Sequence, residues 1–255
     1  MLARIVALAT ALLLGSSAQA QELRQVRVAA AADLKWALEE VKSAFEKERP
    51  GSTLALTFGS SGNFHAQLLQ RAPFDVFLSA DLDYPKRLVE AGLASGLFTY
   101  AIGHLVLWAP NASPLALDRL GMAAVKEASV RKISLANPRH APYGRAAEAA
   151  LRSAGLWDGV QDKLVLGENV SQAAQFVETG SADLGLIALS LALSPRMKPL
   201  GRFWAVPQDR YPRLEQGCIV LDWAQDPGSA KAFTTFLAGP KGAAILARYG
   251  FEAPK

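Results

Sequence analysis

Leu54-Ala55-Leu56-Thr57-Phe58-Gly59-Ser60-Ser61-Gly62-Asn63 is the stretch around which the rest of the chain is organised. Its alternating apolar start predicts a strand, and a helical pattern begins near Phe64, so the residues between them form a tight turn into a helix N-terminus. Such a terminus attracts an anion through free backbone N–H groups and the positive end of the helix dipole. The stretch contains no Lys or Arg, so it would hold an oxyanion through neutral donors. A serine N-cap without a ligand is the alternative interpretation of Ser60 and Ser61.

The first twenty residues have the pattern of a secretory signal peptide. Arg4 precedes a short apolar run over residues 5–14, and Ala18-Gln19-Ala20 forms an Ala-x-Ala cleavage site. The apolar run is too short to span a bilayer. We therefore expect residues 1–20 to be removed, the mature chain to begin at Gln21, and the protein to be periplasmic.

The composition of the 255-residue chain is that of an ordinary globular protein, with enough length for one large or two smaller cores. The formal net charge is +4, of which Arg4 contributes one, and there is no basic run or aromatic-basic interleaving. We therefore expect no nucleic-acid partner. Cys218 is the only cysteine, which excludes an intramolecular disulfide and a lipid-bearing cysteine at the cleavage site.

Strand and helix patterns alternate along the chain, which predicts an α/β fold with mixed, mostly parallel sheets flanked by helices. Ligands of such sheets bind beyond the carboxyl ends of the strands, where Asp33, the serine turn and Ala80-Asp81 fall. The predicted strands cover residues 26–31, 54–58, 75–78, 101–109, 132–135, 164–166, 183–188 and 218–221, and the predicted helices cover 34–46, a segment from Phe64, 84–91, a segment ending at Ala154, one ending at Thr179, 230–237 and 242–249.

The alternation restarts after the long apolar run over residues 101–109, which indicates a second lobe. We expect lobe 1 to comprise residues 21–103 together with 218–255, and lobe 2 to comprise residues 104–217. The chain would then cross twice between the lobes. Two crossings form a hinge, and the ligand cleft would lie between the lobes.

Five segments support a more specific interpretation when they are taken in order. They are Ala29–Leu34, Phe58–Gly62, Ala72–Asp81, Asn137–Gly144 and Gly239–Phe251. Together they resemble the periplasmic molybdate-binding proteins of ABC importers over nearly the whole mature chain. The resemblance implies a two-lobed type II periplasmic-binding fold that closes on molybdate or tungstate. It also implies delivery of that oxyanion to an inner-membrane permease by a monomeric protein that has no cofactor and is not an enzyme.

The resemblance also implies which residues bind the oxyanion. It places the first ligand position on Asp33, with Ala32 before it, and the serine of the second loop on Ser61, beside Ser60. Tyr143 matches a tyrosine that some members use, and Val170 matches a residue that donates its backbone N–H. In other members the tyrosine comes from the position that Ala188 occupies here, so we expect Tyr143 to supply the phenol. The implied contacts to molybdate oxygens, none of them a direct ligand of the metal, are Ala32, Asp33, Ser60, Ser61, Tyr143 and Val170.

Asp33 departs from the family pattern, which has serine, threonine or asparagine at this position. Molybdate is a dianion that offers only hydrogen-bond acceptors, so a carboxylate aimed at it would repel it. We therefore interpret Asp33 as the N-cap of a helix that starts at Leu34, with its side chain facing the helix amides. Two alternatives stay open: the carboxylate accepts a proton from a hydrogen-bearing oxyanion such as phosphate, or it joins an expanded metal coordination shell.

Two other functions are compatible with parts of the sequence. A receptor for sulfate or phosphate would use the same neutral donors, and an exported hydrolase would use Ser60 or Ser61 with a histidine. Hydrolysis needs a histidine, an orienting acid and an oxyanion hole around one serine, and the sequence shows no such set. His65, His104 and His140 lack metal-ligand spacing, which argues against zinc. We expect His140 to be a solvent-facing loop residue.

Overall fold

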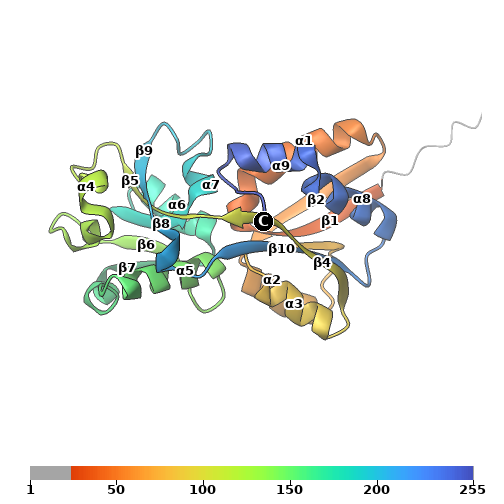
Figure 1. The fold of residues 1–255 in the computed structure, drawn as a ribbon, viewed down its shortest axis with the longest axis horizontal. Helices are drawn as coiled ribbons and strands as arrows, with labels where there is room; N and C mark the ends of the chain where they lie inside the picture. The colour runs from red at the N-terminus through yellow and green to blue at the C-terminus, as the bar shows by residue number, and fades with distance from the viewer. Residues whose placement is uncertain (1–23, 255) are drawn as a thin grey trace, which may run out of the picture.

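Two five-stranded sheets, each in its own lobe, organise the computed structural model, which describes residues 24–254 (Figure 1). The predicted signal peptide and the predicted mature start at Gln21 lie outside the described residues. Within residues 24–254, no helix has the length and apolar composition needed to cross a membrane. The two-lobed fold expected from the alternating pattern is confirmed.

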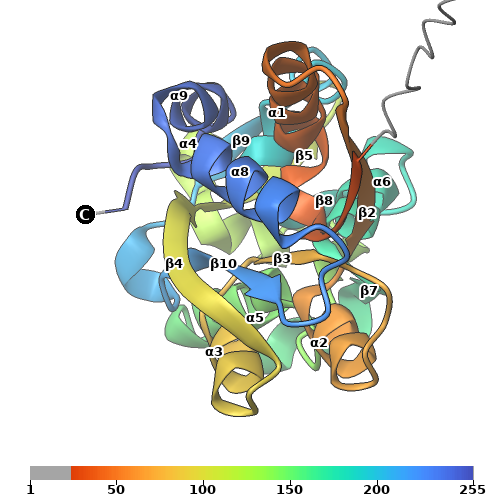
Figure 2. The same cartoon turned by 90° about the vertical axis from the view of Figure 1, so that its right-hand side faces the viewer.

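The sheet of lobe 1 has the strand order β2-β1-β3-β10-β4. Strand β1 pairs in parallel with β2 and β3, whereas β10 pairs antiparallel with β3 and β4. Helices α1, α8 and α9 cover one face of this sheet, and α2 and α3 cover the other (Figure 2). The elements are β1 (Arg24–Ala31), α1 (Lys35–Glu48), β2 (Ser52–Gly59), α2 (Ser61–Leu69), β3 (Val76–Ser79), α3 (Asp83–Glu90), β4 (Ala94–Gly103), β10 (Leu214–Leu221), α8 (Pro227–Ala238) and α9 (Pro240–Arg248).

The sheet of lobe 2 has the strand order β7-β6-β8-β5-β9. It repeats the arrangement of lobe 1, because β6 pairs in parallel with β7 and β8, and β5 pairs antiparallel with β8 and β9. The elements are β5 (Leu105–Pro110), α4 (Leu117–Leu120), β6 (Ile133–Ala136), α5 (Pro142–Ser153), β7 (Leu164–Gly167), α6 (Val170–Glu178), β8 (Leu184–Ala188), α7 (Leu189–Ala192) and β9 (Gly201–Ala205), with short 3-10 helices η1 (Ala32–Leu34) in lobe 1 and η2 (Gly121–Lys126), η3 (Asp158–Lys163) and η4 (Gln208–Arg210).

The single strand predicted over residues 101–109 is wrong. Strand β4 ends at Gly103, which pairs with Leu214 in the first sheet, and β5 begins at Leu105, which pairs with Ala188 in the second. Apolar side chains continue across the break because both strand ends are buried. Hydrophobicity therefore reports burial here, but it does not report the change of sheet.

The two chain crossings are tied together where they pass between the lobes. The backbone N–H of Leu105 donates to the Tyr211 hydroxyl at 3.1 Å, and the Val206 N–H donates to the Leu105 carbonyl at 3.1 Å. We propose these crossings as the hinge, with lobe 1 as residues 21–103 and 218–255 and lobe 2 as residues 104–217. Strand β10, which starts at Leu214, spans the second of these boundaries.

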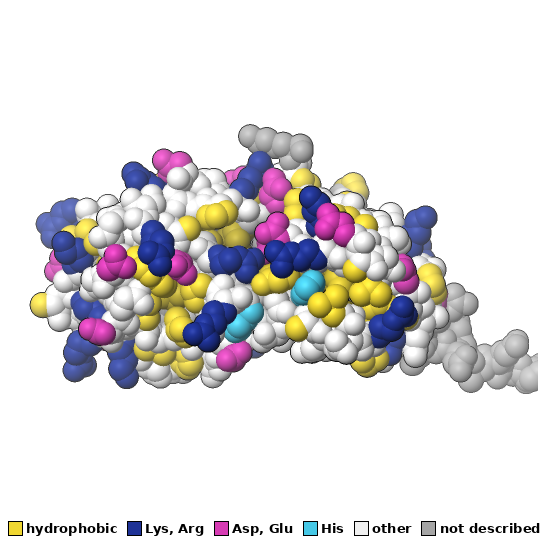
Figure 3. All heavy atoms as spheres, turned by 90° about the horizontal axis from the view of Figure 1, so that it is seen from below, with side chains coloured by type: hydrophobic (Ala, Val, Ile, Leu, Met, Phe, Trp, Pro, Cys, Tyr) yellow, Lys and Arg dark blue, Asp and Glu magenta, His cyan; other side chains and the backbone are white. Residues whose placement is uncertain are grey.

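Charged side chains are mixed on the surface. On the face shown in Figure 3, Lys and Arg side chains alternate with Asp and Glu side chains and with apolar patches. This face therefore offers no continuous basic track of the kind that follows a nucleic-acid backbone.

Candidate functional site

A small cavity lies between the lobes, at the carboxyl ends of the parallel strands. Its volume is about 10 Å³, close to the space that one buried water needs, so the lobes are in a closed arrangement. None of the lining residues, all of them in the described range, is Lys, Arg or His. The lining includes all six residues predicted to contact the oxyanion: it consists of Ala31, Ala32, Asp33, Gly59, Ser60, Ser61, Ala80, Ala141, Pro142, Tyr143, Asn169 and Val170.

Helix starts from both lobes converge on this cavity: η1, which leads into α1, and α2 in lobe 1, and α5 and α6 in lobe 2. Asn169 caps α6, since its side-chain oxygen accepts from the N–H groups of Ser171 and Gln172, both at 3.0 Å. The cap leaves the N–H of Val170, at the first helical position, available to a ligand. Because the positive ends of several helix dipoles meet here, the cavity favours an anion without a cationic side chain.

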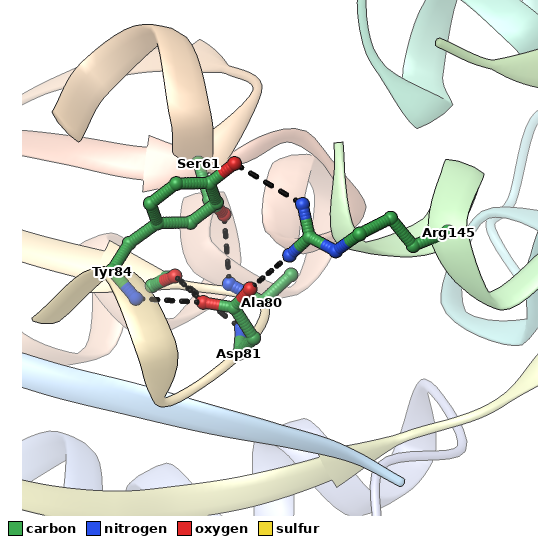
Figure 4. A network of polar contacts seen from close by, with 6 residues as sticks. Ser61, Ala80, Asp81, Tyr84 and Arg145 are labelled. Atoms are coloured by element: carbon green, nitrogen blue, oxygen red, sulfur yellow. Dashed lines mark hydrogen bonds and ion pairs between the residues drawn. The ribbon is translucent and has the colours of Figure 1, made fainter. Parts of the chain in front are cut away.

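The Ser61 side chain is fully buried, and its orientation is fixed by one hydrogen bond. Its Oγ accepts from the backbone N–H of Ala80 at 3.0 Å (Figure 4). A hydroxyl that accepts in this way keeps its own proton to donate. Ser61 is therefore arranged as a hydrogen-bond donor at the edge of the cavity.

Ser60 has a different role, which the capping interpretation describes correctly. It is the N-cap of α2, and its Oγ accepts from the Asn63 N–H at 3.3 Å. The same Oγ lies 2.9 Å from Nδ1 of His140, across the cleft in lobe 2. The prediction that His140 faces solvent in a loop is wrong, because its side chain is only 20% exposed and bridges the lobes. Nothing in the local sequence around His140 could show a partner eighty positions away.

The Ser60–His140 contact continues to Glu168, and the three side chains outline a serine-histidine-acid arrangement. Nε2 of His140 lies 3.7 Å from a Glu168 carboxylate oxygen, and the Glu168 side chain is 69% exposed. That distance is too long for the hydrogen bond by which an acid orients a catalytic histidine. The Ser60 Oγ also accepts the hydrogen bond that caps α2. The geometry therefore serves lobe contact and not nucleophilic attack.

The Tyr143 side chain reaches the cavity from the first turn of α5. It is 2% exposed, and its hydroxyl makes no hydrogen bond of standard geometry in the described structure, although it lies near the Asp33 carboxylate. Burial and the nearby Asp33 carboxylate raise the pKa of Tyr143 well above its usual value, so the phenol keeps its proton. Gly103 makes room for it, since a Cβ at this position would lie 2.3 Å from the Tyr143 hydroxyl. A buried phenol that keeps its proton can donate a hydrogen bond to a ligand in the cavity.

The Asp33 carboxylate does not cap a helix, so the capping interpretation is wrong. Asp33 lies inside η1, and α1 begins at Lys35 with Leu34 as its N-cap and no side-chain cap hydrogen bond. Instead, Oδ2 accepts from the Nε2 group of Gln216 in β10 at 2.7 Å, whereas Oδ1 is buried and makes no hydrogen bond of standard geometry. Local helix propensity could not reveal an amide 183 positions away.

The electrostatic setting of Asp33 is unusual for a carboxyl group. The residue is 1% exposed, and this burial raises its pKa to about 6. The Gln216 hydrogen bond, the nearby Tyr143 hydroxyl and the backbone amides of Asp33 and Leu34 act in the opposite direction and limit the rise. Asp33 therefore titrates closer to neutrality than an exposed aspartate does.

A second set of contacts holds the lobes together beside the cavity. The Arg145 guanidinium in lobe 2 forms an ion pair with the Asp81 carboxylate in lobe 1 and donates to the Tyr84 hydroxyl at 3.1 Å (Figure 4). Burial raises the pKa of Asp81, and Arg145 opposes that rise. The ion pair adjoins the anion cavity directly, because Asp81 follows Ala80, whose N–H fixes Ser61.

Gly62 brings the backbones of the two lobes into direct contact. Its N–H donates to the His140 carbonyl at 2.9 Å. A Cβ at Gly62 would lie 2.5 Å from that carbonyl oxygen and 2.6 Å from the Tyr84 hydroxyl. Only glycine therefore permits this closed arrangement.

Within residues 24–254, no group of three His, Cys, Asp or Glu side chains is placed to hold a metal ion. Cys218 is a buried free thiol.

Known proteins resemble this chain over most of its length. The family described as bacterial extracellular solute-binding protein matches residues 26–252. The molybdate-binding protein ModA of Azotobacter vinelandii is 39% identical over 252 residues, which cover 98% of this chain and 97% of that protein. ModA of Rhodobacter capsulatus is 38% identical over 229 residues, which cover 89% of this chain and 88% of that protein. The solved structure of the Azotobacter vinelandii periplasmic molybdate-binding protein aligns with a TM-score of 0.84 and 33% identity, over 90% of this chain and 100% of that one.

Proposed function

Because the chain belongs to the bacterial extracellular solute-binding proteins, we propose that it captures molybdate or tungstate for an ABC importer. The observation that carries the proposal is the closed cavity with neutral donors from both lobes, in a chain with 39% identity to a molybdate-binding protein. The chain is a transport receptor and not an enzyme, as its relatives are substrate-binding transport proteins.

The donor set matches the chemistry of a tetrahedral dianion. We propose that the Ser61 and Tyr143 hydroxyls and the Val170 backbone N–H donate to the ligand oxygens. Ala32 and Ser60 would add their backbones at the starts of η1 and α2. Each donor is charge-assisted once the anion is present, which shortens and strengthens the bond. No cation holds the ligand permanently, so opening the lobes releases it.

Location and partners follow from the same function. We propose that residues 1–20 direct export, that the mature protein acts as a monomer in the periplasm, and that the closed form delivers its ligand to an inner-membrane permease. The relatives named above support the periplasmic location and the transport role. Molybdate or tungstate is the cargo, and the function requires no resident cofactor.

Calorimetric scanning of the ligand-free mature protein tests this function. Molybdate and tungstate should raise the melting temperature strongly, because they bind the native state alone, whereas sulfate should raise it little. Each anion is added as its sodium salt at equal ionic strength. Equal stabilisation by sulfate would favour a general oxyanion receptor, and stabilisation by phosphate alone would favour a phosphate receptor. A tight complex with neither molybdate nor tungstate would refute the proposal.

A further inference from the structure

Oδ1 of Asp33 and the hydroxyl of Tyr143 are buried, and neither makes a hydrogen bond of standard geometry in the described structure. The two side chains are near enough for the phenol to act on the Asp33 carboxylate as a hydrogen-bond donor, which lowers the pKa of Asp33. Buried polar atoms without a well-formed hydrogen bond are rare in native proteins, and a ligand that enters the cavity can complete the hydrogen bonding of both groups. The phenol can donate to an oxyanion directly. An ionised carboxylate can only accept, and so can an oxyanion such as molybdate.

The second carboxylate oxygen of Asp33 is already committed. Oδ2 accepts from the Gln216 amide at 2.7 Å, and the Gln216 Oε1 accepts from the Tyr100 hydroxyl at 3.0 Å. Tyr100 and Gln216 are both buried, so this chain of donors is directed at Asp33. A proton on Oδ2 would collide with the amide hydrogen. Any proton on this carboxyl group therefore lies on Oδ1, the oxygen that makes no hydrogen bond of standard geometry.

From this geometry we propose that Asp33 Oδ1 and the bound oxyanion share one proton, so that capture of a dianion takes up a proton from solution. The inference rests on the proposed function and adds that oxyanion binding is coupled to proton uptake. Two acceptors can meet in a closed cavity only with a hydrogen between them. The proton balance is the same whichever oxygen holds it: the dianion and one proton enter the complex beside the Asp33 carboxylate, and the dianion and the proton both leave when the lobes open.

The groups around Asp33 leave it as the titrating site of the cavity. Tyr100 in β4 and Tyr143 in α5 keep their protons because burial raises the pKa of both, and burial likewise raises the pKa of Cys218 in β10. Strand β2 and helix α7 contain no titratable side chain, and α6 contains only Glu178, at its far end. Lys35 of α1 is exposed. His140 and the Asp81–Arg145 ion pair lie just outside the residues that line the cavity. Burial raises the pKa of Asp33 itself to about 6.

A shared proton also makes Asp33 a specificity-determining residue. Sulfate is a much weaker base than molybdate, tungstate or phosphate, so it shares a proton with a carboxyl group least readily. Without a shared proton, a sulfate oxygen and the Asp33 carboxylate would both be hydrogen-bond acceptors and would repel each other. Discrimination against sulfate then comes from ligand basicity as well as from cavity size. Monohydrogen phosphate brings its own proton, so its binding would take up none.

Titration calorimetry in two buffers of different protonation enthalpy measures the proton directly. At about pH 7.5 the wild-type protein should take up about one proton for each molybdate bound, and its Kd should rise roughly tenfold per pH unit above about pH 6. Asp33→Asn should bind molybdate with about no proton uptake and a Kd that is nearly constant with pH, because the amide donates to the anion. Its preference for molybdate over sulfate should fall.

Two controls separate this proton from other causes. His140→Gln, which removes the imidazole beside the cavity, should retain the uptake of about one proton, and so should Tyr143→Phe, whatever its affinity. Tight molybdate binding by the wild type without proton uptake would overturn the inference and leave the proposed function intact. Absence of molybdate binding at every pH would overturn the proposed function instead. If Asp33→Asn failed to fold, the wild-type proton number would still decide.

Discussion

Replacement of Gly62 by alanine should separate lobe closure from folding. Gly62 lies in the first turn of α2, with a backbone conformation open to any residue, and alanine has the higher helix propensity by up to about 1 kcal/mol. The ligand-free protein, free to open, should therefore be at least as stable as the wild type. The clash arises only in the closed arrangement, where the Cβ would lie 2.5 Å from the His140 carbonyl oxygen.

The expected loss of affinity follows from that contact. Overpacking typically costs about 1–3 kcal/mol, and displacement of the carbonyl would also weaken the 2.9 Å hydrogen bond from the Gly62 N–H, which adds about 1 kcal/mol. A closed state disfavoured by about 2–4 kcal/mol raises the Kd for molybdate roughly 30- to 1,000-fold.

Titration calorimetry gives the Kd, and urea unfolding of the ligand-free protein gives its stability. Gly159→Ala is a matched control, because a Cβ at Gly159 meets nothing within 4 Å and the residue lies in η3, remote from the cleft. It should change neither quantity appreciably. Wild-type affinity in Gly62→Ala would refute the reasoning, since the ligand-bound lobes would then not approach as closely as the structure shows. A destabilised ligand-free protein would show that Gly62 supports the fold itself.

Three further outcomes follow. Tyr143→Phe should weaken molybdate binding by about 1.5–3 kcal/mol, the scale of a hydrogen bond to a charged partner, with an unchanged melting temperature without ligand; unchanged affinity by calorimetry would contradict the role of the phenol. Arg145→Met removes a partly exposed ion pair between the lobes and should weaken binding by about 1 kcal/mol, with less dependence of the Kd on salt than in the wild type; a Kd equal to the wild type at low salt would exclude the ion pair from closure. The folded-state pKa of Asp33, about 6, lies above its unfolded value of about 3.9, so its contribution to stability is full below about pH 4 and is lost as the pH rises through 6, about 3 kcal/mol in all. Urea unfolding of ligand-free wild type and Asp33→Asn from about pH 4 to about pH 8 checks this, and parallel pH profiles would contradict the burial of Asp33.

Regular patterns along the chain predict much of the fold. The strand before the serine turn, the helix after it and the alternation in both lobes follow from side-chain periodicity, because each element buries one face or both. The sequence does not reveal the break between β4 and β5, because Gly103 and Leu105 are both buried on either side of it. Strand β9 was also missed, since its residues are only half buried and so carry a weak apolar signal.

The candidate site could be predicted only as far as each residue acts alone. The sequence of the serine turn predicts a helix start, and the family resemblance identifies Tyr143 and Val170 as candidate ligand contacts. Gln216 and Arg145 contact residues in other elements, and the sequence next to each of them gives no sign of a role at the site. Gln216, which directly precedes the apolar stretch over residues 217–221 of β10, is a signal that could have been used, because a buried amide requires a partner.

The cap on α6 has a consequence for how this receptor can change over evolutionary time. Because Asn169 takes the later amides and leaves the Val170 N–H to the cavity, that donor persists whatever side chain position 170 carries, proline excepted. Most point mutations leave backbone donors of this kind unchanged. If Asp33, Ser61 and Tyr143 contact the ligand as proposed, the heritable control of cargo choice is concentrated in these side chains, and a substitution at one of them alters the donor set while the amide framework stays in place.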